Sequence, residues 1–342
     1  MILSKKYLIL ALVALISMLN LTSCDTENSK NDDDTLFLGL AALATAPQSV
    51  NLEFDVTANG TAFESNKAIT VNGVSNVVFR DFRFYVSEVK FLRADGTTTD
   101  ATLTDDGIWQ TKNLALLDFE NGKATTGSHG GTSTGMNSKI VGSVPQGNYV
   151  GIQFTIGVPE DLNHLQINDS RAPLNNSAMY WAWASGYKHA KIEFSADTTP
   201  NTTKWTNMHL GSTGFGTSPA ATACKSDVIA GEFGNCPAKF RPRITINGAI
   251  NPGSQKIQMN IDELLKGYTH VGAADADGFG ICMPISPGAA NAGEFNRCNP
   301  LIQNLGLKGR VSNGASAINQ TDLDAGVGSV NTDFSQKVFT LR

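Results

Sequence analysis

The chain has 342 residues, with 26 Lys or Arg and 31 Asp or Glu, so its formal net charge at pH 7 is −5. This length suffices for one large domain or two ordinary ones with a substantial core. Because the charge is negative and no basic run occurs, we do not expect nucleic acid as a partner. The sequence has no P-loop, H-E-x-x-H or C-x-x-C-H motif, so the usual nucleotide-binding, metalloprotease and cytochrome motifs are absent.

The N-terminus has the features of a bacterial lipoprotein signal. Lys5 and Lys6 precede an apolar run at residues 7–19, and Leu21-Thr22-Ser23-Cys24 has the small residues of a lipobox. A membrane-spanning helix is the alternative, but such a helix needs about 20 apolar residues. We therefore predict cleavage before Cys24, acylation of that cysteine and a lipid-anchored protein of the cell envelope, on the periplasmic face or at the outer membrane or surface.

Cleavage divides the chain into three parts: a signal peptide (1–23), a lipidated flexible tether (24–48) and a single β domain (49–342). The mature protein would have 24 basic and 31 acidic residues, a net charge of −7. The tether begins with Asp, Asn, Ser and Lys residues, a composition typical of disordered segments. Its apolar stretch at 36–46 is too short to span a membrane.

The domain contains many short segments with strand-like alternation or β-branched content. We predict strands at 50–56, 77–92, 114–119, 149–156, 188–194, 244–246, 257–261 and 338–341. We expect only single helical turns, at 160–164 and 262–266, and no helix longer than about two turns. Short strands separated by turn residues predict a mainly β fold, an antiparallel β-sandwich-like domain with long loops and disulfides.

Four cysteines follow the signal: Cys224, Cys236, Cys282 and Cys298. An even number of cysteines in an exported chain indicates disulfides, whereas the absence of C-x-x-C gives little support to a zinc site. Three pairings are possible, and pairing each cysteine with its neighbour in sequence is the simplest.

The densest group of aromatic and imidazole side chains lies in MYWAWASGYKHAKIEF (179–194) and HLGSTG (209–214). Trp181 and Trp183 share one face if this segment is extended, and they would then fill a sandwich core. Imidazoles are good ligands for copper and zinc. Taken singly, each of the five histidines is more often structural or solvated than a ligand: His129, His164, His189, His209 and His270.

Several segments, in this order, resemble the MbnP-like family. They are DFRFYVSEVKFL (81–92), LALLDFENG (114–122), GVPEDLNH (157–164), APLN (172–175), MYWAWASGYK (179–188) and HLGSTG (209–214). Members of this family are exported four-cysteine proteins, usually encoded beside a MauG-like di-haem cytochrome c peroxidase. The resemblance covers most of residues 50–307.

The resemblance implies copper, held as Cu(I), and a partner peroxidase that oxidises a Trp to kynurenine. Cu(I) accepts few ligands, so two imidazoles and a weak aryl amine suffice. Carried onto this chain, the candidates are His164 and His209 with Trp181 or Trp183, of which Trp183 is slightly favoured. His189 stands where the family usually has an aromatic residue and is a further candidate. Phe215 replaces the usual Cys after HLGSTG, which leaves the cysteine connectivity open.

A different class of function also fits the tryptophans. In an adhesin or glycan-binding module, Trp181, Trp183 and Trp205 would stack on sugar rings and no metal would be needed. A di-haem peroxidase gene adjacent to the gene of this protein would favour the copper-binding interpretation over the glycan-binding one.

Overall fold

A computed structural model describes residues 46–122, 135–182, 185–196, 205–212, 236–270, 280–282, 292–311 and 320–342. Residues Pro47–Arg342 form one compact unit, separate from Met1–Ala46. The predicted signal peptide, Cys24, Trp183, His129 and Cys224 lie outside the described residues. None of the helices in the described ranges combines the length and apolar character that a membrane crossing needs.

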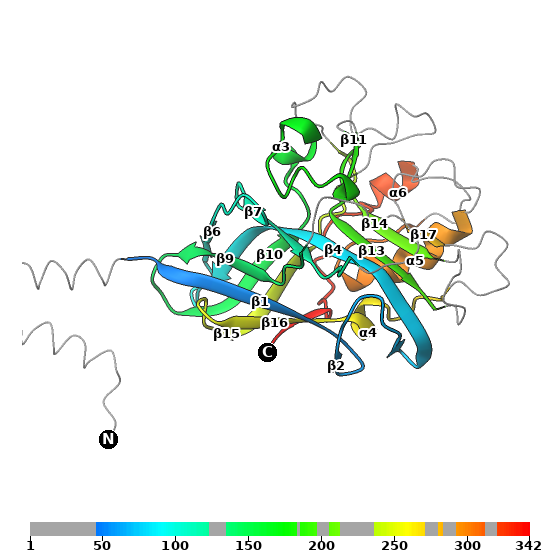
Figure 1. The fold of residues 1–342 in the computed structure, drawn as a ribbon, viewed down its shortest axis with the longest axis horizontal. Coiled ribbons are helices and arrows are strands. Elements are labelled where there is room, and N and C mark those ends of the chain that lie inside the picture. The colour runs from blue at the N-terminus through cyan, green and yellow to red at the C-terminus, as the bar shows by residue number, and fades with distance from the viewer. Residues whose placement is uncertain are drawn as a thin grey trace, which may run out of the picture. The chain divides into compact units, whose positions relative to one another are not determined.

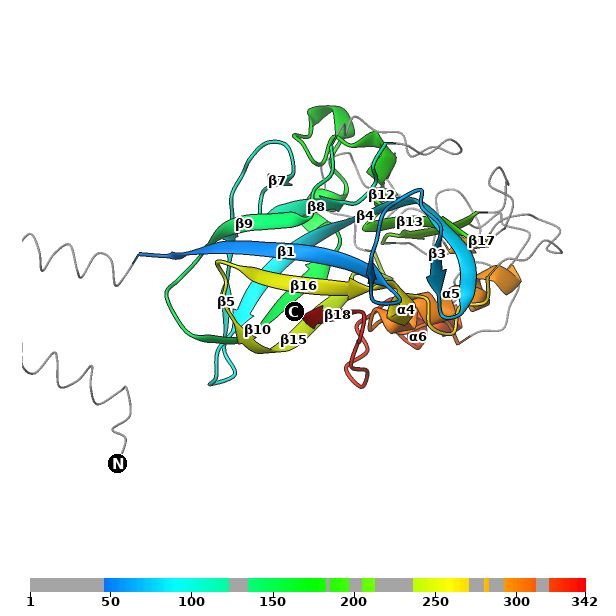
Figure 2. The ribbon, with the colours of Figure 1, turned by 60° about the horizontal axis from the view of Figure 1, so that its bottom comes forward.

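Two large β-sheets and a separate two-stranded hairpin occur in the described part of the domain. The first follows the order β18-β16-β1-β9-β6, and β2 pairs with β1. Its strands are β1 (Gln48–Ala58), β2 (Thr61–Ala62), β6 (Thr102–Leu103), β9 (Lys139–Val144), β16 (Gln255–Asn260) and β18 (Phe339–Leu341). Figure 2 shows β1, β9 and β16 side by side, with β4 and β10 of the second sheet behind them.

The second sheet has ten strands, and its main path is β15-β10-β4-β13-β14-β17. The path contains β4 (Val74–Leu92), β10 (Tyr149–Ile156), β13 (Ala190–Ser195), β14 (Thr206–Leu210), β15 (Arg243–Ile250) and β17 (Gly280–Cys282). Attached to it are β3 (Ile69–Val71), β5 (Thr98–Asp100), β7 (Gln110–Thr111) and β8 (Leu114–Asp118). The strand pairs recorded in the described ranges are antiparallel, apart from the parallel pairs β1–β16 and β14–β17. The predicted mainly β, antiparallel, sandwich-like fold is confirmed.

The core lies between the two sheets. Phe54 of β1 packs its ring edge-on against Phe84 of β4 and Phe154 of β10, at centroid distances of 6.4 and 5.7 Å. Phe82, Phe84 and Val86 all face this core because side chains two apart in a strand share one face. The alternation along β4 thus fixes which of its residues form the opposite face.

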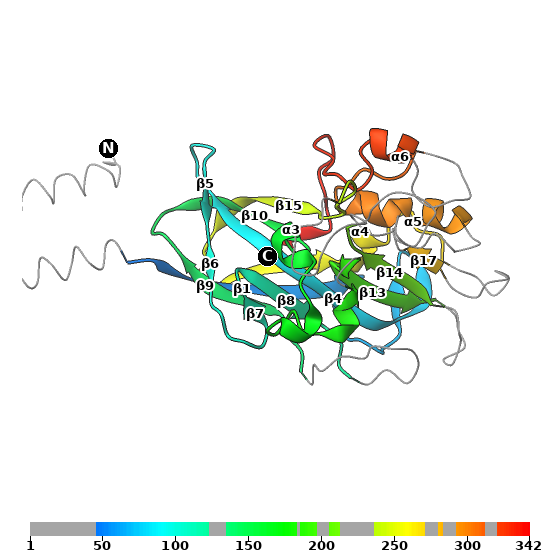
Figure 3. The ribbon, with the colours of Figure 1, turned by 90° about the horizontal axis from the view of Figure 1, so that it is seen from above.

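The segment between β10 and β13 leaves the sheets and covers that opposite face of β4. It contains α3 (Glu160–Asn163), the 3-10 turns η1 (Ile167–Asp169) and η2 (Ser177–Met179), and a hairpin of β11 (Tyr180–Ala182) with β12 (Gly186–Tyr187). Figure 1 shows α3 and β11 above β4, and Figure 3 shows the same layer from above. Tyr85, Leu116, Leu162 and Tyr187 belong to a second, smaller hydrophobic cluster in this layer. This layer positions the candidate site.

The prediction that the tryptophan pair fills the sandwich core is wrong for Trp181, the member of the pair that the structure describes. Trp181 lies in the β11–β12 hairpin, which is separate from both large sheets, and its side chain is partly exposed. Strand-like alternation identified an extended segment correctly but could not show which sheet, if any, the segment joins.

The remaining helices are α4 (Ile261–Leu264), α5 (Ala292–Asn304) and α6 (Gln320–Asp324). The expectation of no helix longer than about two turns is wrong, because α5 has 13 residues. Its composition hides its helical period, yet Leu301 and Ile302 are buried and a disulfide joins Cys298 of α5 to Cys282 of β17. This disulfide confirms one of the two predicted pairs. Cys236 is also disulfide-bonded, and Cys224, its predicted partner, lies outside the described residues.

Candidate metal centre

The covered face of the second sheet carries a buried layer of charged side chains. On β13, Lys191 stands directly opposite Arg83 of β4 and His209 of β14, while Glu193 stands opposite Asp81 of β4. Directly opposed residues on neighbouring strands project from the same face. Of these five side chains, His209 is the most exposed, at 7 %. Their burial follows from the strand register together with the layer above the sheet.

These charges are paired with one another. Asp81 accepts hydrogen bonds from Arg83 Nε at 2.8 Å and from Lys191 Nζ at 2.6 Å. Glu193 Oε2 accepts from Arg80 Nε, and Glu193 Oε1 lies 3.3 Å from Lys191 Nζ. A buried charge is tolerated when it is paired and hydrogen-bonded, and these groups meet that condition.

His209 is held by one ring nitrogen only. Its Nε2 lies 2.8 Å from Glu193 Oε1, whereas its buried Nδ1 has no hydrogen-bond partner. Burial by itself would raise the pKa of Glu193, but the hydrogen bond from His209 and the charge of Lys191 lower this pKa to about 2. Glu193 is therefore ionised at neutral pH and can only accept, so His209 Nε2 carries the proton that it donates.

The Nδ1 atom of His209 is consequently a lone-pair nitrogen. Burial lowers the pKa of His209, despite the opposing hydrogen bond to Glu193, and the ring is neutral at pH 7. A neutral imidazole that donates one N–H to a carboxylate and leaves its other nitrogen unpaired has the arrangement of a metal-ligating histidine. An unpaired buried nitrogen is costly in a purely structural residue. His209 therefore fits a metal ligand.

Trp181 lies against the end of β14, the strand that carries His209. A Cβ atom on Gly211 would be only 2.3 Å from Trp181 Cζ3 and 2.7 Å from Cη2, so the indole occupies the space of a side chain at position 211. Gly211 is two residues beyond His209 in an extended segment, and a side chain there would project on the same face as His209. The indole therefore packs over Gly211, two residues beyond His209.

Lys188 lies over the same indole. Its Nζ is 5.4 Å from the Trp181 ring centroid and donates to the carbonyl oxygens of Ala178 at 2.9 Å and Tyr180 at 3.1 Å. The side chain is buried, and among the described residues it forms no ion pair with a carboxylate. Burial, assisted by the charge of Lys191, lowers the pKa of Lys188 to about 8.

His189 is bonded inside the protein at both ring nitrogens. Its Nδ1 accepts from the backbone N–H of Val158 at 3.1 Å, so Nε2 carries the proton and donates to Ser212 Oγ at 3.0 Å. Burial, with the charge of Arg241, lowers the pKa of His189 well below its ordinary value. To bind a metal, His189 would have to lose one of these hydrogen bonds. Its geometry is therefore that of a structural residue, which connects the loop before α3 to the residues that follow β14.

His164 follows α3 directly and is buried rather than displayed on a loop. Its Nε2 lies 3.3 Å from Asn163 Nδ2 and 3.7 Å from Cys236 Sγ. The Asn163 amide is oriented by Tyr187, whose backbone N–H donates to Oδ1 at 3.0 Å. His164 therefore neighbours a cystine sulfur and an amide donor.

The other predicted candidates are placed as follows. His270 packs its ring edge-on against Phe194 and Tyr268, at centroid distances of 5.8 and 5.3 Å. Trp205 is 8 % exposed and the Arg80 guanidinium lies 4.4 Å from its ring centroid, so Trp205 offers no open face for a sugar. Within the ranges that the structure describes, no group of three His, Cys, Asp or Glu residues is arranged to hold a metal ion.

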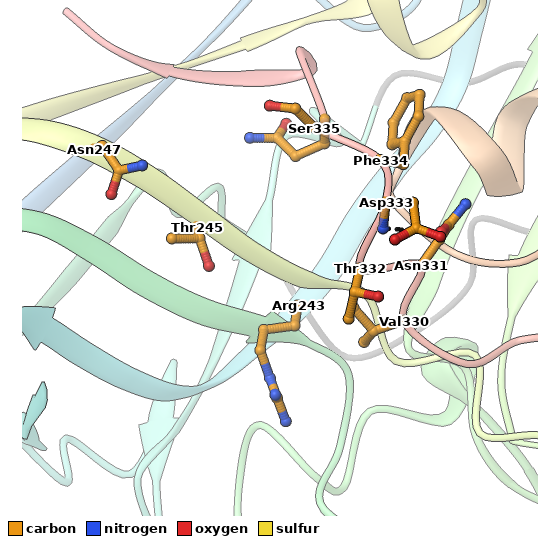
Figure 4. A pocket seen from close by; sticks show the side chains of 11 residues that line it. Arg243, Thr245, Asn247, Val330, Asn331, Thr332, Asp333, Phe334 and Ser335 are labelled. Carbon is orange, nitrogen blue, oxygen red and sulfur yellow. Dashed lines mark hydrogen bonds between the residues drawn. The ribbon is translucent and has the colours of Figure 1, made fainter. Parts of the chain in front are cut away.

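A separate pocket lies beside β15, away from this centre. It has a volume of about 460 Å³ and is lined by Arg243, Thr245 and Asn247 of β15 and by the segment 330–336. Figure 4 shows the polar side chains of both elements around it, with Phe334 at its edge. Figures 1 and 2 place β15 on the opposite side of the domain from β11 and β12. This pocket shares no residue with the candidate metal centre.

Sequence reasoning missed three residues of the centre: Glu193, Lys188 and Gly211. A detectable signal existed for Glu193, because Lys191 and Glu193 are charged residues at alternate positions of an otherwise apolar strand. Gly211 carries no such signal, since its role depends on an indole that reaches it from another part of the chain.

A protein-family model, MbnP, matches residues 47–284 of the chain. Among solved structures, MbnP from Methylosinus trichosporium is similar, with a TM-score of 0.59 and 21 % sequence identity. That match covers 86 % of this chain and 98 % of the other. No curated protein shows a significant match.

Proposed function

Because this chain belongs to the MbnP family, we propose that it is a copper-binding protein of the bacterial cell envelope whose site holds Cu(I). The observation that carries this proposal is the unpaired, buried Nδ1 of His209, whose other nitrogen is fixed by an ionised glutamate. A neutral imidazole suits Cu(I), and copper would supply the redox and ligand-binding chemistry of the site. His164 and Trp181 are the further residues that we propose to hold the metal.

We propose further that the protein is the substrate of a MauG-like di-haem peroxidase and not an enzyme itself. Oxidation of a tryptophan to kynurenine would turn a ring without a good metal donor into an aryl amine. The position of Trp181 supports this role, because its indole is partly exposed and packs over Gly211, two residues beyond His209. This position moves the preference from Trp183, which the sequence favoured slightly, to Trp181.

The modification can be tested by co-expression with a MauG-like di-haem peroxidase. We expect kynurenine in the peptide that spans residues 179–188, at position 181, when the peptide is fragmented in a mass spectrometer. Protein expressed without the peroxidase should carry unmodified tryptophan and bind Cu(I) more weakly in competition with a chelator. Unmodified tryptophan at both positions, in co-expressed protein that binds Cu(I) tightly, would refute the modification and leave the copper site standing.

We place the protein at the membrane through a lipid on Cys24. Replacing Cys24 by Ser should release the protein into the soluble fraction, because an acylated cysteine is the one strong membrane signal in the sequence. Fractionation of cells that express the parent and the Cys24→Ser variant tests this. A variant that stays with the membranes would point instead to the apolar stretch at 36–46.

A further inference from the structure

Lys188 differs from the other buried cations of the candidate metal centre. Arg83 and Lys191 each contact Asp81, so their charges are neutralised within the layer. Lys188, in contrast, bonds two carbonyl oxygens and an indole face, all of them uncharged groups. Among the described residues no carboxylate contacts this buried ammonium group, and burying a charge without a partner is costly.

The position of this charge relates it to the proposed metal ligand. Lys188 lies over the Trp181 ring, and that ring fills the side-chain space of Gly211, two residues beyond His209 and on the same face. Burial is the main cause of the lowered pKa of His209, and the positive charge of Lys188 lowers this pKa further. The electrostatic effect of Lys188 therefore reaches His209. Because little water screens charges in this layer, the Lys188 ammonium would act strongly on any metal ion that binds at His209.

We infer that the charge of Lys188, which no carboxylate contacts among the described residues, makes this centre selective for a monovalent metal ion over divalent ions. This inference rests on the proposed function and concerns the specificity of the same site. Imidazole ligands alone favour Cu²⁺ and also accept Zn²⁺, so ligand type does not exclude them. A fixed positive charge repels a divalent ion twice as strongly as a monovalent one, and therefore shifts the preference toward Cu(I).

The experiment compares Cu(I) and Zn(II) affinities at pH 7, by chelator competition, in the parent and in Lys188→Gln. Glutamine keeps an N–H donor for the carbonyls of Ala178 and Tyr180 but removes the charge. We expect the variant to gain affinity for Zn(II) relative to Cu(I) by about tenfold, the effect of one unit charge at roughly 10 Å and an effective dielectric of about 20. Lys188→Arg, which keeps the charge, should restore the selectivity of the parent.

Lys188→Met serves as a second neutral variant, and near- and far-ultraviolet circular dichroism checks that each variant is folded. If both neutral variants bind Cu(I) and keep the parental ratio of affinities, the selectivity role is refuted while the copper site stands. If the parent binds no Cu(I) at all, the proposed function fails, and this inference fails with it.

Discussion

Replacing Asp81 by Ala is expected to lower the free energy of unfolding by about 3–5 kcal/mol. Asp81 is fully buried and pairs with two cations, Arg83 and Lys191. Its removal would leave the positive charges of Arg83 and Lys191 in a space from which water is excluded. Glu193 can neutralise only part of this charge, through its 3.3 Å contact with Lys191. Chemical denaturation of the parent and the variant, followed by fluorescence, measures the difference.

The same long strand provides a matched control. Lys90 of β4 pairs with Asp100 of β5, but Asp100 is 74 % exposed. Because exposed ion pairs contribute little, Asp100→Ala should cost less than about 1 kcal/mol. Equal losses for the two variants would show that the layer beneath α3 is hydrated and that its charges are not dependent on one another.

The strands and their faces were predictable from the sequence because alternation of apolar and polar residues is a local property. Phe82, Phe84 and Val86 face the core as their spacing in the sequence predicts, and the same spacing puts Arg83 and Tyr85 on the opposite face. It did not predict that this opposite face is buried too. A covered face with charged residues looks the same in sequence as a solvated face, and only the fold shows which it is.

The candidate centre was predictable in part for a related reason. His209 and Trp181 were candidates because their motifs resemble a known family, and the structure packs the Trp181 indole over Gly211, two residues beyond His209. The difference between His189 and His209 was beyond the sequence. Both are buried imidazoles near the end of β14, yet one has partners on both nitrogens and the other on one. Such a difference depends on single hydrogen bonds from distant segments.

Replacing His209 by Ala is expected to weaken Cu(I) binding by more than about 100-fold. Loss of a residue that only hydrogen-bonds to a metal ligand costs roughly 10- to 100-fold in affinity, and His209 is proposed to be a ligand itself. The variant loses the one imidazole nitrogen among the described side chains that is buried without a hydrogen-bond partner. Competition with a Cu(I) chelator measures the affinity. His270→Ala is the matched control, because it also removes an imidazole with a lowered pKa, in this case a half-buried one that packs against Phe194 and Tyr268. We expect His270→Ala to bind Cu(I) as the parent does.

Glu193→Gln tests the tautomer on which this prediction depends. A glutamine can turn its amide and donate to His209 Nε2, which would move the ring proton to Nδ1 and remove the lone pair that a metal needs. We therefore expect Glu193→Gln to weaken Cu(I) binding by about 10- to 100-fold, less than His209→Ala does. The double variant should bind no more weakly than His209→Ala alone, since the carboxylate acts through the imidazole. If Glu193→Gln and His209→Ala both bind Cu(I) like the parent, the metal site lies elsewhere, and His164 is the next residue to replace.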